Sequence, residues 1–184
     1  MDKGSPVTLI YRLRADNTIS YVGSGWREFA EHNDAPELMP AAVLDKPIDD
    51  YIDGADAQRL FALLFARVRN DNTRVTFPFR CDAPDRRRYC RMEMVPLDDD
   101  GIEMQSIVER VERREDISLL DRKLPRGADG VTICSWCRKV YSPQSGWVEV
   151  EQAIAEMDLM GREEQPRLSH SICPRCYTRA NAQR

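Results

Sequence analysis

The chain has 184 residues, 42% of them apolar and 8% aromatic, with a formal net charge of −4. This composition excludes a disordered chain, and the small negative charge gives no reason to expect broad attraction to nucleic acids. No apolar run approaches the roughly 20 residues that cross a bilayer, and the N-terminus lacks the apolar stretch of a signal peptide. We therefore expect a cytoplasmic protein that makes no membrane contact. In that compartment its six cysteines are thiols or metal ligands rather than disulfides.

The first half of the chain begins with two predicted strands, residues 7–13 and 18–22, which are joined by a tight turn. Ser24 can then cap a short helix, and brief helical turns are expected around residues 37–53. The clearest predicted helix covers residues 55–69, where apolar side chains form a broad stripe opposite the arginines.

Two further strands, residues 73–81 and 88–96, are predicted to form a hairpin. Folding the hairpin about the centre of its connection places Cys81 opposite Cys90 and gives both strands one wholly apolar face. That face also pairs Phe79 with Met92 and Phe77 with Met94, whereas Arg80, Arg91 and Glu93 fall on the other face. Both cysteines are then core residues, and a disulfide between them is the less favoured alternative.

A last strand of this half is predicted over residues 102–111. Two strands, helices and three strands form an α+β unit with its helices on one face of an antiparallel sheet. In this element order, and in the segments Tyr11 to Ile19 and Trp26 to Ala30, residues 1–115 resemble a PAS domain. The resemblance implies a five-stranded antiparallel sheet flanked by helices, and a role as a sensory or partner-binding domain.

The PAS resemblance also bears on ligands. Members that bind flavin for light sensing carry an Asn-Cys-Arg-Phe-Leu type motif, and haem-binding members take a histidine from the long connecting helix; this chain has neither. We therefore expect no bound chromophore, and His32 is expected to be an exposed polar residue. The aromatic residues expected around the PAS pocket are Trp26, Phe29, Phe61, Phe77 and Phe79. They either fill the pocket themselves or leave room for a small apolar ligand.

Residues 116–130 are predicted to form a helical linker. Ile117, Leu119, Leu120 and Leu124 could lie on one face of a short amphipathic helix, and the proline and glycines that follow predict a flexible joint. Two interpretations of this helix stay open: it folds back on its own domain, or it contacts a dimer partner.

Two Cys-x-x-Cys pairs dominate the last part of the chain, Cys134 with Cys137 and Cys173 with Cys176. A pair with this spacing lies on a tight turn whose sulfurs converge, and two such pairs complete a tetrahedral thiolate site. Zinc is the metal that such soft ligands most often hold. A segment as short as residues 131–184 rarely stays folded without a cross-link of this kind. We therefore predict a small, treble-clef-like zinc module there.

Other residues are predicted to support this site. Pro174 suits the first turn of a helix, whose N-terminus favours anionic thiolates. Trp136 and Trp147 are expected to pack over the site and keep water from the sulfurs. His170 is expected to hydrogen-bond a thiolate or a carbonyl; the alternative is that it replaces one cysteine as a ligand.

The segments Ile133 to Val140 and Ser169 to Cys176, with Trp147 between them, resemble a C-terminal extension of bacterial signalling proteins, including PAS-containing sensor kinases. The chain has no phosphate-binding loop and no His-Glu-x-x-His or Gly-x-Ser-x-Gly motif. We therefore predict a non-enzymatic bacterial signalling protein with a structural zinc, whose output passes through a protein partner or a homodimer. Two alternatives remain. One is a redox sensor in which cysteine oxidation ejects zinc; the other is a nucleic-acid-binding zinc module, which the nearly balanced charge of residues 131–184 disfavours.

Overall fold

The computed structural model describes residues 8–182, so the predicted strand start at Val7 lies outside the described residues. The chain divides into two compact units. The first contains residues up to Asp53 together with Gln58–Pro78 and Cys90–Glu109, and the second contains Gly54–Ala57, Phe79–Tyr89 and the chain from Arg110 onward. The second unit therefore includes more than the predicted zinc module: a hairpin turn and the start of a long helix also belong to it.

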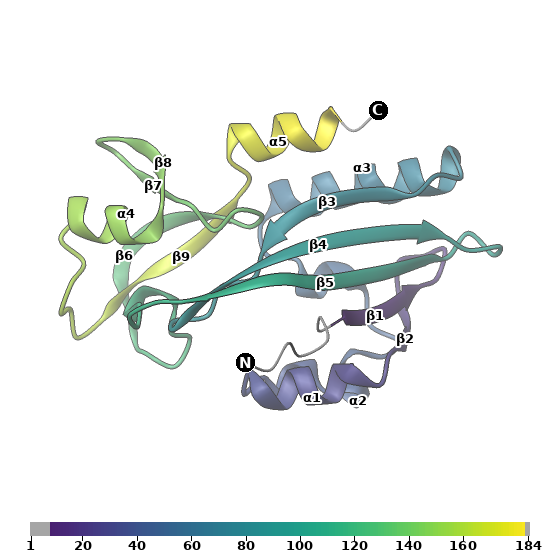
Figure 1. Ribbon diagram of the computed structural model, residues 1–184, viewed down its shortest axis with the longest axis horizontal. Helices are drawn as coiled ribbons and strands as arrows, with labels where there is room; N and C mark the ends of the chain where they lie inside the picture. The colour runs from purple at the N-terminus through teal and green to yellow at the C-terminus, as the bar shows by residue number, and fades with distance from the viewer. Residues whose placement is uncertain (1–7, 183–184) are drawn as a thin grey trace. The chain divides into compact units, whose positions relative to one another are not determined.

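The N-terminal elements follow the predicted order. The strands are β1 (Thr8–Leu13), β2 (Ile19–Val22), β3 (Val75–Arg80), β4 (Arg86–Pro96) and β5 (Ile102–Arg113), and the helices are α1 (Gly25–His32), α2 (Pro40–Val43) and α3 (Ala55–Asn70). The strands form one sheet in the order β2-β1-β5-β4-β3, in which β1 runs antiparallel to β2 and to β5 (Figure 1). The predicted α+β class with a five-stranded antiparallel sheet is confirmed.

The core of the first unit lies where the alternating pattern predicted it. Phe77 on β3, Met94 on β4 and Leu60 on α3 are buried as predicted. Phe65, which the predicted helix stripe omits, is also buried, whereas Leu63 of that stripe is 58% exposed. Cys90 is buried and, like the other five cysteines, is free of any disulfide. Apolar side chains at every second strand position therefore cover one face of the sheet, as a half-buried sheet requires.

The turn of the β3–β4 hairpin differs from the prediction. The two residues that flank Pro84 and Asp85 exchange backbone hydrogen bonds of 3.0 and 3.3 Å, so the turn is a tight one centred on this dipeptide. Cys81 donates its N–H to the carbonyl of Arg88 at 3.0 Å, and the predicted pairing of Cys81 with Cys90 is wrong by two positions. Proline suits the first central position of a turn. The prediction placed the turn at the midpoint of the connection and took no account of this preference. A shift of two residues leaves every side chain on its predicted face.

Residues 116–130 do not form the predicted helix. They contain a 3-10 turn at Ser118–Leu120, and strand β6 (Arg126–Cys134) begins within the segment. Ile117, Leu119 and Leu120 are buried in the core of the second unit. A helix this short has little stability of its own, and an extended chain with one turn buries the same side chains.

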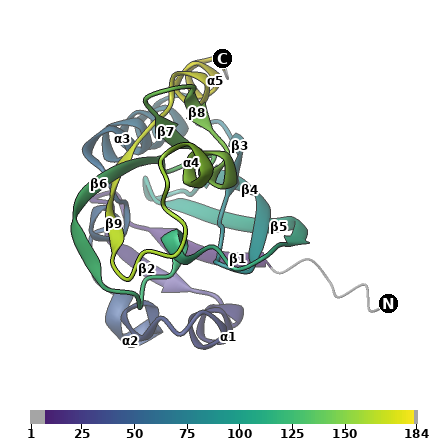
Figure 2. The same cartoon turned by 90° about the vertical axis from the view of Figure 1, so that its left-hand side faces the viewer.

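The second unit contains a four-stranded sheet. Besides β6, its elements are β7 (Val140–Ser142), β8 (Gly146–Val148), α4 (Val150–Glu156), β9 (Gln165–Ser171) and α5 (Pro174–Asn181). The strand order is β8-β7-β6-β9, with β6 and β9 parallel and lying side by side (Figures 1 and 2). Helix α4 buries Val150 and Ala153 in the core of this unit. Across the described part of the chain, every helix is too short or too polar to span a membrane.

Candidate metal centre

The four predicted cysteine ligands lie together in the second unit. Cys134 is the last residue of β6, and Cys137 follows it in a tight turn. Cys173 is the N-cap residue of α5, and Cys176 lies in the first turn of that helix. All four Sγ atoms lie within 4.8 Å of one another. Three of the cysteines are buried, and Cys137 is half-buried.

The parallel pairing of β6 with β9 explains why the two cysteine pairs meet. Cys134 on β6 aligns with Ser171 on β9, so both strands end at the same edge of the sheet and each leads into a Cys-x-x-Cys pair. The N–H of Ser135 donates to the carbonyl of Ser171 at 2.9 Å, which continues the pairing into the first turn. The fold thus brings together two turns that are separated in sequence by a hairpin, a helix and a loop.

The turn at the first pair is closed by backbone hydrogen bonds. Cys134 donates its N–H to Lys139 O at 2.7 Å, and Arg138 donates its N–H to Cys134 O at 3.0 Å. Arg138 has a φ of +59°, a left-handed conformation that glycine adopts most readily. The Arg138 side chain is largely enclosed, and this burial lowers its pKa, an effect that nearby Cys81 and Asp82 oppose.

The geometry of the sulfurs fits a tetrahedral thiolate site. Zn–S bonds of about 2.3 Å in a tetrahedron place neighbouring sulfurs about 3.8 Å apart. The Sγ atoms of Cys137 and Cys173 are 3.7 Å apart. The backbone N–H of Cys173 donates to Cys134 Sγ at 3.4 Å, and such a donor at a helix N-terminus favours a thiolate. This donor set could hold a soft or borderline metal ion.

The thiols of Cys134, Cys137 and Cys176 change one another's pKa. Hydrogen bonds from the thiols of Cys137 and Cys176 lower the pKa of Cys134 well below its usual value. The contact with Cys134 raises the pKa of Cys137 to about 12 and raises the pKa of Cys176 even further. Protons on these thiols keep neighbouring sulfurs from repelling one another as anions. A divalent cation can replace those protons, because each cysteine binds a metal as its thiolate.

Of the residues predicted to support the site, His170 lies outside the donor group, as its preferred prediction expects, and its predicted hydrogen bond stays a prediction. Among the described residues, the group of converging donors contains the four cysteines and not His170, which pairs with Ile133 across β9 and β6. Trp147 is half-buried and packs edge to face against Tyr141, with ring centroids 5.7 Å apart. Trp136 is buried within the first cysteine turn, so it is the tryptophan that the protein encloses there.

The residues predicted to surround a PAS pocket divide between the units. Trp26, Phe29, Phe61 and Phe77 belong to the first unit, and Phe79 belongs to the second. The rings of Phe61 and Phe77 pack edge to face with centroids 6.0 Å apart, and Trp26 Nε1 donates to Leu38 O at 2.6 Å. These contacts are with the protein itself, and both predicted alternatives, a filled pocket and a pocket with room for a small apolar ligand, stay open. The side chain of His32 is 74% exposed, as predicted.

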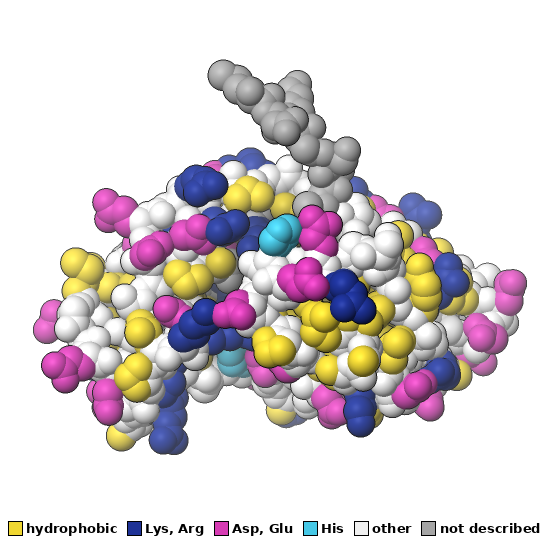
Figure 3. Space-filling model, turned by 90° about the horizontal axis from the view of Figure 1, so that it is seen from below, with side chains coloured by type: hydrophobic (Ala, Val, Ile, Leu, Met, Phe, Trp, Pro, Cys, Tyr) yellow, Lys and Arg dark blue, Asp and Glu magenta, His cyan; other side chains and the backbone are white. Residues whose placement is uncertain are grey.

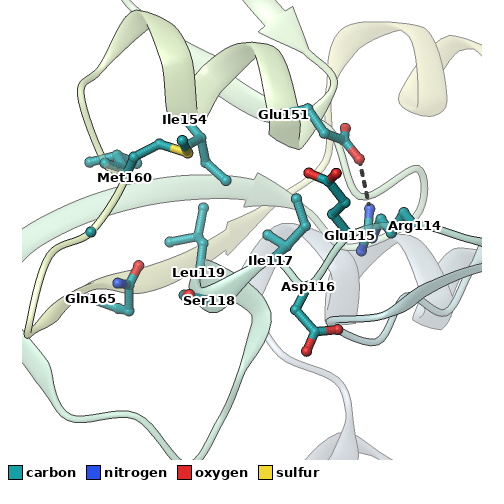
Figure 4. A pocket seen from close by; sticks show the side chains of 12 residues that line it. Arg114, Glu115, Asp116, Ile117, Ser118, Leu119, Glu151, Ile154, Met160 and Gln165 are labelled. Carbon is teal, nitrogen blue, oxygen red and sulfur yellow. Dashed lines mark hydrogen bonds and ion pairs between the residues drawn. The ribbon is translucent and has the colours of Figure 1, made fainter.

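A hollow of about 360 Å³ lies in the second unit, outside both predicted sites (Figure 4). Its walls come from the chain after β5, from α4 and from the loop before β9. Ile117, Ile154 and Met160 line an apolar part, and the ion pair of Arg114 with Glu151, 3.2 Å long, lies at the other end. No sequence motif marks this hollow, because its walls come from three separate segments of the chain.

Comparisons with known proteins assign no family to the chain. No family model matches it, and no curated protein sequence matches it significantly. Among solved structures, a domain of an HTR-like protein from Haloarcula marismortui is 15% identical, with a TM-score of 0.42, over 56% of this chain and 98% of that one. A sensory box sensor histidine kinase from Vibrio cholerae is 12% identical, with a TM-score of 0.39, over 60% of this chain and 84% of that one. At these identities and TM-scores, neither similarity assigns a function to the chain.

Proposed function

We propose that the chain is a non-enzymatic signalling protein in which a PAS-like sensor or docking domain, residues 1–115, is joined to a zinc-holding module, residues 131–184. The observation that carries the metal part is the convergence of four Sγ atoms within 4.8 Å. The sensor part rests on the five-stranded antiparallel sheet and its element order, which are what the PAS resemblance implies. Because the sequence carries no catalytic motif, the output passes through a protein partner or a homodimer.

The zinc would stabilise the module rather than sense oxidants. Oxidation of a cysteine requires an accessible thiolate, and Cys134, Cys173 and Cys176 are buried. The metal would supply a cross-link between two turns, whose free energy of binding becomes free energy of folding in a small module. This burial favours a structural zinc over the redox-sensor alternative.

The surface charge favours a protein partner over a nucleic acid. Acidic and basic side chains are interspersed across the face drawn in Figure 3, and the formal net charge is −4. Nucleic-acid binding depends on a concentration of positive charge that neutralises phosphates. A partner protein or a second copy of the chain has no such requirement.

Metal analysis tests the first part of this proposal. Protein purified under reducing conditions should contain close to one equivalent of zinc, as measured by inductively coupled plasma mass spectrometry. Cys173→Ser lacks one of the four ligands and should retain much less zinc, whereas Cys90→Ser should retain it because Cys90 lies outside the donor group. A folded, metal-free second unit would contradict the proposal.

Partner recovery and mass measurement test the second part. The zinc-loaded chain should either form a homodimer by light scattering or recover a signalling protein in stoichiometric amount from its native host. The purified partner should then bind wild type more tightly than Cys173→Ser. A zinc-loaded chain that stays monomeric and recovers no stoichiometric partner would contradict a docking role.

A further inference from the structure

Arg80 connects the first cysteine turn to a hairpin that lies far earlier in the sequence. The backbone N–H of Arg80 donates to the carbonyl of Trp136 at 2.7 Å, and Trp136 lies between Cys134 and Cys137. The last residue of β3 therefore holds the middle of the turn that presents two of the four sulfurs. The sequence pattern placed Arg80 on the polar face of the hairpin, yet its side chain is only 9% exposed.

The guanidinium group of Arg80 is held by two carboxylates. Its Nε donates to Asp82 Oδ1 at 3.1 Å, its Nη2 contacts the other oxygen of Asp82, and its Nη1 lies 2.6 Å from Glu149 Oε2. The Asp82 side chain is completely buried. Burial alone would lower the pKa of Arg80, but the hydrogen bonds to Asp82 and Glu149 outweigh it and raise that pKa. Removing either partner of such a bidentate buried pair leaves an uncompensated charge.

Arg114 extends these contacts around the hairpin turn. Its Nη1 lies 3.5 Å from Asp82 Oδ2 and 3.2 Å from Glu151 Oε1. Its guanidinium group also donates to the carbonyls of Ala83 at 2.8 Å and Pro84 at 3.1 Å. The turn is therefore fixed through its backbone as well as through Asp82.

The same carboxylates belong to the start of α4. Glu149 is the N-cap residue of this helix, and Glu151 lies in its first turn. Between them, Val150 is buried in one core cluster with Ile133, which precedes the cysteine ligand Cys134. Charged contacts on one side of α4 and apolar contacts on the other thus link the hairpin turn to the strand that carries the first cysteine pair.

We propose that Arg80 and Asp82 are positioning residues of the metal centre, an inference that rests on the zinc site proposed above. The metal fixes the cysteine turn, whose Trp136 carbonyl accepts the N–H of Arg80. The contacts of Arg80 with Asp82 and Glu149 hold the hairpin turn against the start of α4. Because a coupling between two sites acts equally in both directions, zinc binding stabilises the hairpin turn, residues 79–89, and an intact turn strengthens zinc binding. Strand β3 ends and strand β4 begins at this turn.

Zinc affinity of the full chain tests the first half of this coupling. It is measured by competition with a chromophoric chelator, and cobalt(II) absorption reports four-sulfur coordination. Arg80→Met should weaken zinc binding by roughly 10- to 100-fold, the range for residues that orient metal ligands. Arg80→Lys should restore part of the loss, because lysine keeps the charge but not the planar, bidentate fork. The control is Arg12→Met, which removes the ion pair of 2.9 Å with Glu103 on β5 and should leave the affinity unchanged.

Hydrogen exchange tests the reciprocal half. Residues 79–89 should exchange faster in zinc-free than in zinc-loaded full chain, and Arg80→Met should exchange fast even when loaded. Should Arg80→Met fail to fold, Asp82→Asn and Glu149→Gln disturb the same contacts and should each weaken zinc binding by a smaller factor. Affinities within twofold of wild type in these variants, or exchange at residues 79–89 that ignores zinc, would overturn the proposal and leave the metal centre standing. A wild-type chain that binds no zinc would refute the metal centre itself.

Discussion

The two units differ in what fills their cores. The first unit buries large side chains, among them Phe65, Phe77, Met94 and Met104, each of which is at most 1% exposed. The core cluster of the second unit is aliphatic, built from valines, leucines, isoleucines and one alanine. The second unit also contains the four thiols and the buried ion pair of Arg80 with Asp82. Hydrophobic stabilisation scales with the apolar area removed from water, so the second unit depends more on polar contacts and on a removable ion.

This difference indicates how each unit can be unfolded. A core of large apolar side chains is weakened by cavities, whose cost depends on volume. A unit held by thiolates and buried charges is weakened by removing one participant, because the remaining charges lose their compensation. The predictions below use that contrast, and the largest effect concerns the metal.

Removal of zinc should unfold the second unit and spare the first. Structural zinc supplies on the order of 10 kcal/mol or more to a small module, which exceeds what the aliphatic cluster can replace. With a strong chelator present, amide hydrogens of β6 and β9 should exchange within seconds to minutes, while those of β1 and β2 stay protected. Adding zinc back should restore the protection. Unchanged exchange in β6 and β9 after complete metal removal would break the comparison.

A cavity in the core of the first unit should destabilise that unit and leave the zinc content of the second unit unchanged. Phe77→Ala removes a side chain that is 1% exposed and packs on Phe61, and it should lower the free energy of unfolding by about 3–5 kcal/mol. The loss should appear in urea unfolding followed by exchange of β1 and β2, with the zinc content of folded protein unchanged. Phe77→Leu, which keeps most of the volume, should lose about 1.5 kcal/mol or less. A loss of zinc from Phe77→Ala at a concentration of urea that leaves the first unit folded would contradict the separation of the two cores.

Patterns that repeat along the chain predicted much of this molecule. The alternation of apolar residues identified Phe77 and Met94 as core residues, because period two is a local property of a strand. The same alternation could not fix the hairpin register, since a shift of two residues preserves it. The conformational preference of Pro84 decides that register. The helix expected over residues 116–130 failed for a related reason: the spacing of Ile117, Leu119 and Leu120 also suits a 3-10 turn packed on a core.

The metal centre shows the same division between local and distant information. The spacing within each Cys-x-x-Cys pair pointed to the four sulfurs that the fold brings within 4.8 Å. The parallel pairing of β6 with β9, which brings the pairs together, is not visible in any local pattern. Alternation along the hairpin assigned Arg80 to the face opposite the apolar one, and that pattern carries no information on its burial. Its burial depends on Asp82 and Glu149, and the second of these comes from a helix far along the chain.

Single cysteine variants should separate ligands from bystanders. Cys134→Ser removes the sulfur that accepts the N–H of Cys173. Loss of one of four ligands should weaken the free energy of zinc binding by about 3 kcal/mol, roughly a quarter of the metal's contribution. Cys81→Ser is the matched control: this thiol also belongs to the second unit but not to the converging group. Cys81→Ser should bind zinc as wild type does, measured by chelator competition. Equal losses in both variants would show that the effect is one of packing and not of coordination.

The smallest predicted loss of stability concerns Gly54. This residue directly precedes α3 and belongs to the second unit. Gly54 has a φ of +95°, and a Cβ built there would lie 2.5 Å from the carbonyl oxygen of His170 on β9. Gly54→Ala should therefore cost about 2–3 kcal/mol, because it combines a strained backbone with a contact that only backbone movement can relieve.

Gly146 provides the matched control for that prediction. Its φ is also positive, at +71°, but a Cβ there meets no atom within 4 Å, so Gly146→Ala should cost only about 1 kcal/mol of backbone strain. Urea unfolding of zinc-loaded protein, followed by exchange of β9, measures both variants. The difference between them isolates the close approach of Gly54 to His170 from the strain that both glycines share. If the two variants lose the same free energy of unfolding, the backbone at Gly54 does not lie as close to His170 on β9 as the structure places it.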